Sequence, residues 1–233
     1  MARKPAGEKP ELPSPTKTDR ERIIEALMAL LAEKPFESIG FAEIAERSGL
    51  TLAQCRAEFG STIGVLAAHI KEIDRAVLAG GEADMAEEPP RERLFDVLMR
   101  RLEMLAPHRA AIRSLLSSAA RNPGLAVALN GLALRSQQWM LTAANIDAAG
   151  PRGMIRAQGL ALLYARVVRV WLRDEDPGLA RTLAALDREL ARGQRWASFL
   201  DGLCRLAGTG LSRRRRARSR RQDADGGEEP AAA

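Results

Sequence analysis

The sequence is poor in the residues that mark several common classes of protein. Aromatic residues make up 4 % of its 233 residues, and cysteine and histidine occur only twice each. The low aromatic content disfavours a sheet-rich fold, and Cys55 and Cys204 lie too far apart to suggest a disulfide or zinc framework. Arg or Glu interrupts every helix-sized apolar window, which argues against a membrane-spanning helix, and residues 1–15 lack the apolar run of a secretory signal. We therefore expect a cytoplasmic protein.

The net charge of +6 is unevenly distributed along the chain. Seven arginines fall between residues 213 and 221, and without them the remaining chain carries a charge near −1. Such a run can bind a polyanion, either a nucleic acid or an anionic membrane, or can serve only to keep the protein in solution. We expect the proline-rich residues 1–15 and the Arg-rich residues 209–233 to be disordered.

Alanine, leucine, arginine and glutamate dominate the rest of the sequence, and their periodicity predicts an all-α fold of about nine helices. The first helices are short, and the longer amphipathic helices that follow are separated by proline-containing breaks. This increase in the predicted helix length divides the chain into a helical head, residues 16–80, and an antiparallel helical domain, residues 89–208.

Two short helices in the head carry the signature of a helix–turn–helix motif. Gly49 lies in the turn between a helix over 41–48 and one that opens at Thr51. The residues expected to pack between the two helices are Ile44, Ala45, Leu50, Leu52 and Cys55. The polar start of the second helix would then face outwards, as the base-reading part of a recognition helix does.

The candidate DNA-binding residues are Arg47, Thr51, Leu52, Ala53, Gln54, Arg56 and Thr62. Gln54 has two alternative roles, because it could contact a base or could only complete a capping box with Thr51.

A resemblance to the N-terminal domain of the tetracycline-repressor (TetR) family is carried by residues 18–66, TDRERIIEALMALLAEKPFESIGFAEIAERSGLTLAQCRAEFGSTIGVL. The matching features are the opening amphipathic helix, Phe36, the pair Ile44 and Ala45, Gly49, and Phe59 followed by a fourth helix. The resemblance implies a homodimer that binds double-stranded DNA and blocks transcription until a small ligand binds its C-terminal helices. Two recognition helices of such a dimer stand about 34–36 Å apart.

The sequence departs from the TetR pattern at three positions that face phosphates in that family. Gly40 stands in place of a hydroxyl residue, Arg56 in place of a tyrosine and Thr62 in place of a lysine. Arg56 can still reach a phosphate or a guanine edge, but Gly40 cannot and Thr62 offers only a hydroxyl. Because phosphate contacts supply much of the affinity for DNA, these departures favour a second interpretation of the chain.

That second interpretation comes from the C-terminal part, where residues 91–113, 161–176 and 182–190 are similar to the TetR-fold lipid-binding family of ubiquinone biosynthesis. It implies an accessory protein that binds a lipid or isoprenoid and keeps a vestigial DNA-binding head. Both resemblances imply a small apolar or lipid-like ligand. The candidate pocket residues are Met104, Trp139, Met140, Leu163, Tyr164, Val167 and Trp171, with ordinary core packing as the alternative role for each.

The last long helix carries apolar residues at 4-3-4-3 spacing, a narrow seam that suits packing against another helix. These residues are Leu179, Leu183, Leu186, Leu190, Gly193, Ala197, Leu200 and Cys204. The seam could lie within one chain or between two copies. The TetR resemblance implies a four-helix bundle between two copies, formed by residues 152–173 and 178–206.

Nothing in the sequence resembles a catalytic constellation, a Gly-rich phosphate loop or a metal-ligand cluster. His69 and His108 occur without other ligand types at metal-binding spacing, and Asp174, Glu175 and Asp176 are expected in a solvated turn. We therefore expect no catalytic activity, cofactor or metal. The leading hypothesis is a homodimeric TetR-type repressor controlled by a small apolar ligand.

Overall fold

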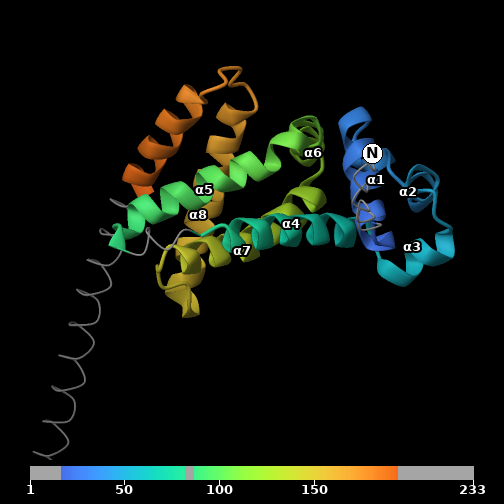
Figure 1. Ribbon diagram of the computed structural model, residues 1–233, viewed down its shortest axis with the longest axis horizontal. Helices are drawn as coiled ribbons and strands as arrows, with labels where there is room; N and C mark the ends of the chain where they lie inside the picture. Colours follow the sequence, from blue (N-terminus) through green and yellow to red (C-terminus); the bar gives the residue numbers. More distant parts are fainter. Residues whose placement is uncertain (1–16, 82–86, 194–233) are drawn as a thin grey trace, which may run out of the picture.

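The computed structural model describes residues 17–81 and 87–193, so the expectations for residues 1–15, 194–206 and 209–233 lie outside it. The N-terminal helices gather at one end of the molecule, and the later helices form the rest (Figure 1). The described residues form α-helices and short 3-10 turns, without a strand. The predicted all-α fold is therefore confirmed.

The head contains α1 (Asp19–Glu33), the 3-10 turn η1 (Phe36–Ser38), α2 (Phe41–Ser48) and α3 (Leu52–Glu58). A capping box starts α1, because the Thr18 hydroxyl accepts from the Glu21 amide at 3.2 Å and the Glu21 carboxylate accepts from the Thr18 amide at 2.8 Å. The apolar face of α1 is fully buried at Ile23, Leu27 and Leu31. This face forms the centre of the head, against which α2, α3 and α4 pack.

The long helix α4 (Thr62–Ala79) connects the head to the rest of the molecule, which we call the body (Figure 1). Val65 and Leu66 at its start belong to the core of the head, whereas Val77 near its end belongs to the core of the body. Contacts between α1 and α6 provide a second connection. The position of the head is therefore set by α4 and by the packing of α1 on the body.

The body contains α5 (Pro90–Leu105), the 3-10 turn η3 (Ala106–His108), α6 (Arg109–Arg121), α7 (Pro123–Ala143), α8 (Gly150–Trp171) and a further helix over 180–193. Its core is centred on the fully buried side chains of Leu98, Leu102, Met140 and Trp171. Helix α7 ends at Ala143, and Asn145 follows it in a left-handed conformation with a φ of 57°. Gly150, with a φ of 64°, begins α8.

The expectation of a solvated turn after α8 is wrong for Asp174, whose side chain is 1 % exposed. Its Oδ2 atom accepts from the amide and from the hydroxyl of Thr182, at 2.8 and 2.7 Å. These hydrogen bonds hold the pKa of Asp174 below its usual value, although burial acts in the opposite direction. The Asp174 side chain lies inside because it supplies an acceptor for the first backbone amides of the helix over 180–193, which have no partner within that helix.

Candidate nucleic-acid interface and ligand-binding body

A tight turn sets α3 against α2 in the head. Gly49 follows α2 with a φ of 66°, a left-handed conformation that suits glycine. The Arg22 guanidinium donates to the carbonyl of Ser48 at 2.6 Å and to that of Gly49 at 3.3 Å. Helix α1 thus holds the end of α2, and this fixes the direction in which α3 starts.

The buried side of this turn agrees with the sequence analysis except at one residue. Ile44, Ala45 and Cys55 are buried and Leu50 is half-buried, but Leu52 is 57 % exposed. The expectation that Leu52 packs against α2 is therefore wrong. Leu52 is exposed because it is the first residue of α3, and this end of the helix does not contact the core of the head.

The start of α3 presents an exposed polar tip, which we define as Thr51, Ala53, Gln54 and Arg56. The Thr51 hydroxyl accepts from the Gln54 amide at 3.2 Å, and the Gln54 side-chain oxygen accepts from the Thr51 amide at 3.0 Å. The Gln54 side-chain amide also donates to Asp19 of α1 at 3.0 Å. Gln54 thus performs the capping role, and it would have to leave Asp19 to reach a base.

Arg47, at the end of α2, lies against α1. Its two terminal nitrogens each donate to one Glu33 oxygen, both at 2.7 Å. The hydrogen bond to Arg47 lowers the pKa of Glu33, and that to Glu33 raises the pKa of Arg47. Any contact between Arg47 and a phosphate would compete with this bidentate pair.

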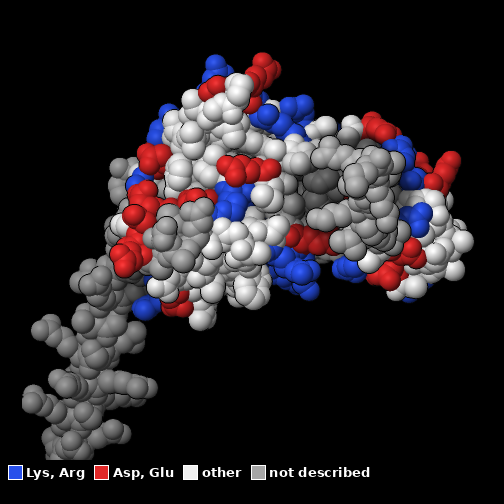
Figure 2. Space-filling model, viewed as in Figure 1, with Lys and Arg blue, Asp and Glu red and all other residues white. Residues whose placement is uncertain are grey.

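The three positions that depart from the TetR pattern lie at helix ends of the head. Gly40 precedes α2, is exposed and leaves open space where a side chain would stand. Arg56 is exposed on α3, and Thr62 is half-buried at the first position of α4. The head also shows charged side chains of both signs on the face seen in Figure 2.

Two residues that border α3, Arg20 and Ser61, are not among the candidates predicted from the sequence. The Arg20 guanidinium lies 4.7 Å from the centre of the Phe59 ring and 3.8 Å from Glu58. The exposed Ser61 caps α4 by accepting from the Gly64 amide at 3.1 Å. The spacing of Ser61 before a helical run could have identified the cap, but the position of Arg20 follows only from the packing of α1 beside α3.

Five of the seven candidate pocket residues come together in the body. Met140, Leu163, Tyr164, Val167 and Trp171 are all buried in one core cluster. The other two do not join them, because Met104 is 40 % exposed and Trp139 is 59 % exposed. Their helices turn these two side chains to the outside of the body.

A polar cluster that the sequence analysis did not foresee lies inside the body. The Asp74 carboxylate of α4 accepts from Arg101 of α5 at 3.2 Å and from the Ser136 hydroxyl of α7 at 2.7 Å. The Arg101 guanidinium lies 5.1 Å from the centre of the Tyr164 ring. Burial raises the pKa of Tyr164, and Arg101 partly offsets this effect.

The side-chain oxygen of Gln137 is buried without a hydrogen-bond partner, whereas the Tyr164 hydroxyl interacts with Arg101, whose charge and hydrogen bond lower the pKa of Tyr164. Buried polar groups are nearly always paired in proteins, with protein or with ordered water, so the Gln137 oxygen can accept a further hydrogen bond. Gln137 follows Ser136 on α7 and is 1 % exposed.

The outer face of the body carries apolar side chains on α7 and α8. Met154, Ile155 and Leu162 of α8 are 52, 59 and 53 % exposed, and Val127 of α7 is 74 % exposed. A shallow hollow lined by Gly150, Pro151, Met154, Ile155 and Gln158 lies on the same face. The described part of the seam on the last helix is different. Leu186 and Leu190 are buried in the chain's own core, and only Leu183, at 37 % exposed, is open.

None of the described helices is long and apolar enough to cross a membrane. Within residues 17–81 and 87–193, no group of three or more His, Cys, Asp or Glu side chains is placed to hold a metal ion.

The arrangement of these helices is similar to solved structures of TetR regulators. A TetR transcriptional regulator from Nitrosomonas europaea ATCC 19718 superimposes with a TM-score of 0.60 at 22 % identity, over 76 % of this chain and 99 % of that one. A TetR transcriptional regulator from Rhodococcus sp. RHA1 gives a TM-score of 0.54 at 22 % identity, over 75 % and 95 %. The chain therefore has the TetR-like fold. At the level of sequence it matches no family profile and no curated protein.

Proposed function

We propose that this chain is a homodimeric transcription repressor of the TetR type, which acts in the cytoplasm and binds double-stranded DNA through α3. The observation that carries the proposal is the exposed polar tip of α3, held by α1 and α2 at the far end of the head from the body. Exposed Thr51 and Arg56 are suited to contact base edges and phosphates. Thr62 and Ser61 would add hydroxyl contacts from the start of α4.

We place the dimer interface on α8, within the predicted residues 152–173. Apolar side chains exposed on one helix face and rimmed by polar residues are typical of a surface that pairs with a partner. The reciprocal hydrogen bonds between Asn130 and Gln158, at 3.0 and 3.1 Å, join α7 to α8 beside this face. The contribution of residues 178–206 would come mainly from their exposed side, because the described apolar seam packs on the chain itself.

The regulatory ligand would bind in the body, near Gln137, whose unpaired side-chain oxygen supports a site there. Helix α6 offers a route from this region to the head. Arg113 of α6 donates to the Leu172 carbonyl at the end of α8 at 2.6 Å, and Ser114 donates to the Lys34 carbonyl at the end of α1 at 3.0 Å. A ligand changes the spacing of the heads only to the extent that it prefers one arrangement.

DNA binding tests the proposal directly. Fluorescence anisotropy with the DNA upstream of the protein's own gene is measured over a salt series for the full chain, Arg56→Ala and the charge-matched control Arg121→Ala. Arg121 is exposed at the end of α6, outside the head and the proposed interface. We expect salt-dependent binding that Arg56→Ala weakens, with the slope of log K against log salt reduced by about 0.9, and no change for Arg121→Ala. Absence of binding at low salt would refute the DNA-binding role.

The second candidate function is a lipid- or isoprenoid-binding accessory protein with a vestigial head. It is favoured by Arg47 and Gln54, two candidate DNA contacts that are engaged with the acidic side chains of Glu33 and Asp19. Extraction and mass spectrometry of the purified protein would support it if a lipid co-purifies while DNA binding is absent. A protein that binds DNA and releases it when this lipid is added would support the repressor instead.

A further inference from the structure

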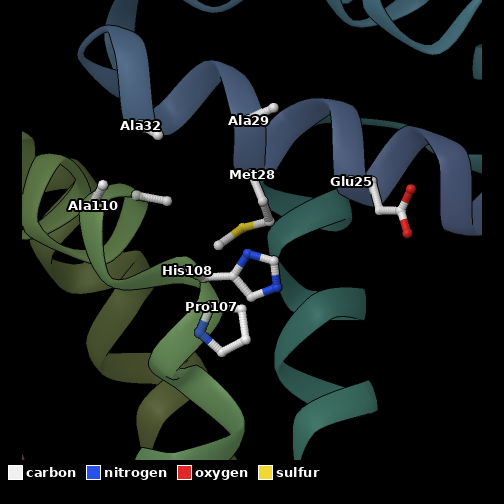
Figure 3. Close-up of a pocket in the computed structure, with 8 residues that line it drawn as sticks. Glu25, Met28, Ala29, Ala32, Pro107, His108 and Ala110 are labelled. Carbon is white, nitrogen blue, oxygen red and sulfur yellow. The ribbon is translucent and has the colours of Figure 1, made fainter. Parts of the chain in front are cut away.

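A small cavity lies where the head meets the body (Figure 3). Its volume is about 210 Å³, and α1 forms one side while η3 and the start of α6 form the other. The apolar lining residues are Met28, Ala29, Ala32, Pro107, Ala110 and Ala111. A cavity of about 150 Å³ is large enough for benzene. This one is open to solvent at Ala29, Ala32 and Ala110, and its volume leaves room for a single ring with a substituent.

One wall of the cavity is the imidazole of His108, towards which the Met28 side chain points (Figure 3). The ring of His69, from α4, packs edge-to-face on His108 with the ring centres 4.7 Å apart. His69 is 5 % exposed, and its Nε2 atom is buried without a hydrogen-bond partner. The junction therefore holds more hydrogen-bonding capacity than the described protein groups satisfy.

Both imidazoles are in the form that accepts a hydrogen bond. Burial, with further contributions from His108 and Arg101, lowers the pKa of His69 to about 4. Burial also lowers the pKa of His108, while Glu25 acts in the opposite direction. At neutral pH each ring is then uncharged and keeps one nitrogen lone pair.

The charges around the cavity exclude an anionic occupant. No Lys or Arg is among the eight lining residues, and the only charged one is Glu25 at the rim. The Glu25 carboxylate already forms an ion pair with Lys17, with 2.6 Å between oxygen and nitrogen, so it does not favour a cationic occupant either. The cavity thus suits an uncharged molecule with an apolar body and one hydrogen-bond donor.

We propose that this cavity binds a small uncharged ring compound carrying one hydroxyl group, of the phenol class, with the hydroxyl donating to His108. The site is separate from the ligand site proposed in the body, and it does not depend on DNA binding. An occupant would contact both α1 and α6, and it would therefore stabilise one orientation of the head relative to the body.

Methyl NMR of methionine tests the site with phenol as the probe. Met28 lines this cavity, whereas Met154 lies on α8 away from it, so the Met154 signal reports effects of phenol elsewhere in the protein. We expect the Met28 methyl signal to shift saturably with a Kd of about 1 mM, as suits so small a ligand, while Met154 does not. Equal, unsaturable shifts of both signals, or none at Met28, would overturn the proposal.

Two variants and a matched control define the geometry. Ala110→Leu fills the cavity and should weaken phenol binding at least tenfold, whereas Ala120→Leu makes the same change at an exposed position further along α6 and should have no effect. His108→Phe keeps a ring but removes the acceptor, and should weaken phenol binding about tenfold without weakening benzene binding. Benzoate or benzylamine binding as tightly as phenol would contradict the assignment to an uncharged ligand.

Discussion

Removing a polar group from two neighbouring residues of α7 is expected to change the free energy of unfolding in opposite directions. The Ser136 hydroxyl donates to Asp74 at 2.7 Å inside the body. Ser136→Ala leaves this buried carboxylate without one of its donors, and we expect the free energy of unfolding to fall by about 1–2 kcal/mol. The Gln137 side-chain oxygen has no partner, although the residue is 1 % exposed. Gln137→Leu removes that unpaired atom at similar volume, and we expect a gain of about 1 kcal/mol.

The assay is urea unfolding followed by circular dichroism, at one fixed protein concentration because a dimer's stability depends on concentration. In thermal unfolding, 1 kcal/mol corresponds to about 2–4 °C for a protein of this size. A Gln137→Leu protein that is clearly less stable than the unmodified chain would show that the amide is already paired, and would remove the reason to place a ligand there. If the regulatory ligand binds near Gln137, the Gln137→Leu protein should also need more of this ligand to release DNA.

Three further predictions concern the cap of α2, the dimer face and the buried carboxylate. Gly40→Ser should stabilise the head by a few tenths of a kcal/mol and tighten DNA binding in anisotropy titrations, because the extended backbone at Gly40 and the open space beside it suit a capping hydroxyl; weaker binding would argue against a phosphate at this position. Leu162→Arg should raise the Kd of the dimer at least about 30-fold in sedimentation experiments, whereas an unchanged dimer would move the interface away from the outer face of α8. Asp174→Asn should reduce thermal stability at pH 7. Because its pKa is lowered by folding, the advantage of Asp174 is present above the unfolded-state pKa of about 3.9 and is lost as the pH falls through the lower folded-state value; a stability difference that is the same at pH 3 and pH 7 would contradict this.

The sequence was sufficient to predict the fold because the helix ends carry local signals. The capping boxes at Thr18 and Thr51 and the left-handed Gly49 are contacts between near neighbours in the chain, so spacing alone predicts them. The exposure of Leu52 could not be predicted in this way, because it depends on how far α3 projects beyond α2. Asp174 was misjudged for the same reason, since its partner Thr182 lies in the next helix.

The sites were less predictable than the fold, because they are assembled from separate helices. The cluster of Asp74, Arg101 and Ser136 joins α4, α5 and α7, and no spacing in the sequence connects these residues. Met104 and Trp139 were grouped with the pocket by residue type, but helix orientation turns them outwards. The pairs Arg47–Glu33 and Gln54–Asp19 likewise arise only because α1 packs beside α2 and α3.

The distance between the two heads in a DNA complex tests the central claim most directly. Spin labels attached through Glu46→Cys, at an exposed position of α2 outside the candidate DNA contacts, would be measured by pulsed electron paramagnetic resonance in a chain whose two native cysteines are replaced by alanine. We predict a narrow distribution that, corrected for the offset between the label and α3, separates the two α3 helices by the 34–36 Å between successive major grooves. A distribution without a defined distance between subunits, or one that added DNA leaves unchanged and far from this value, would contradict the account.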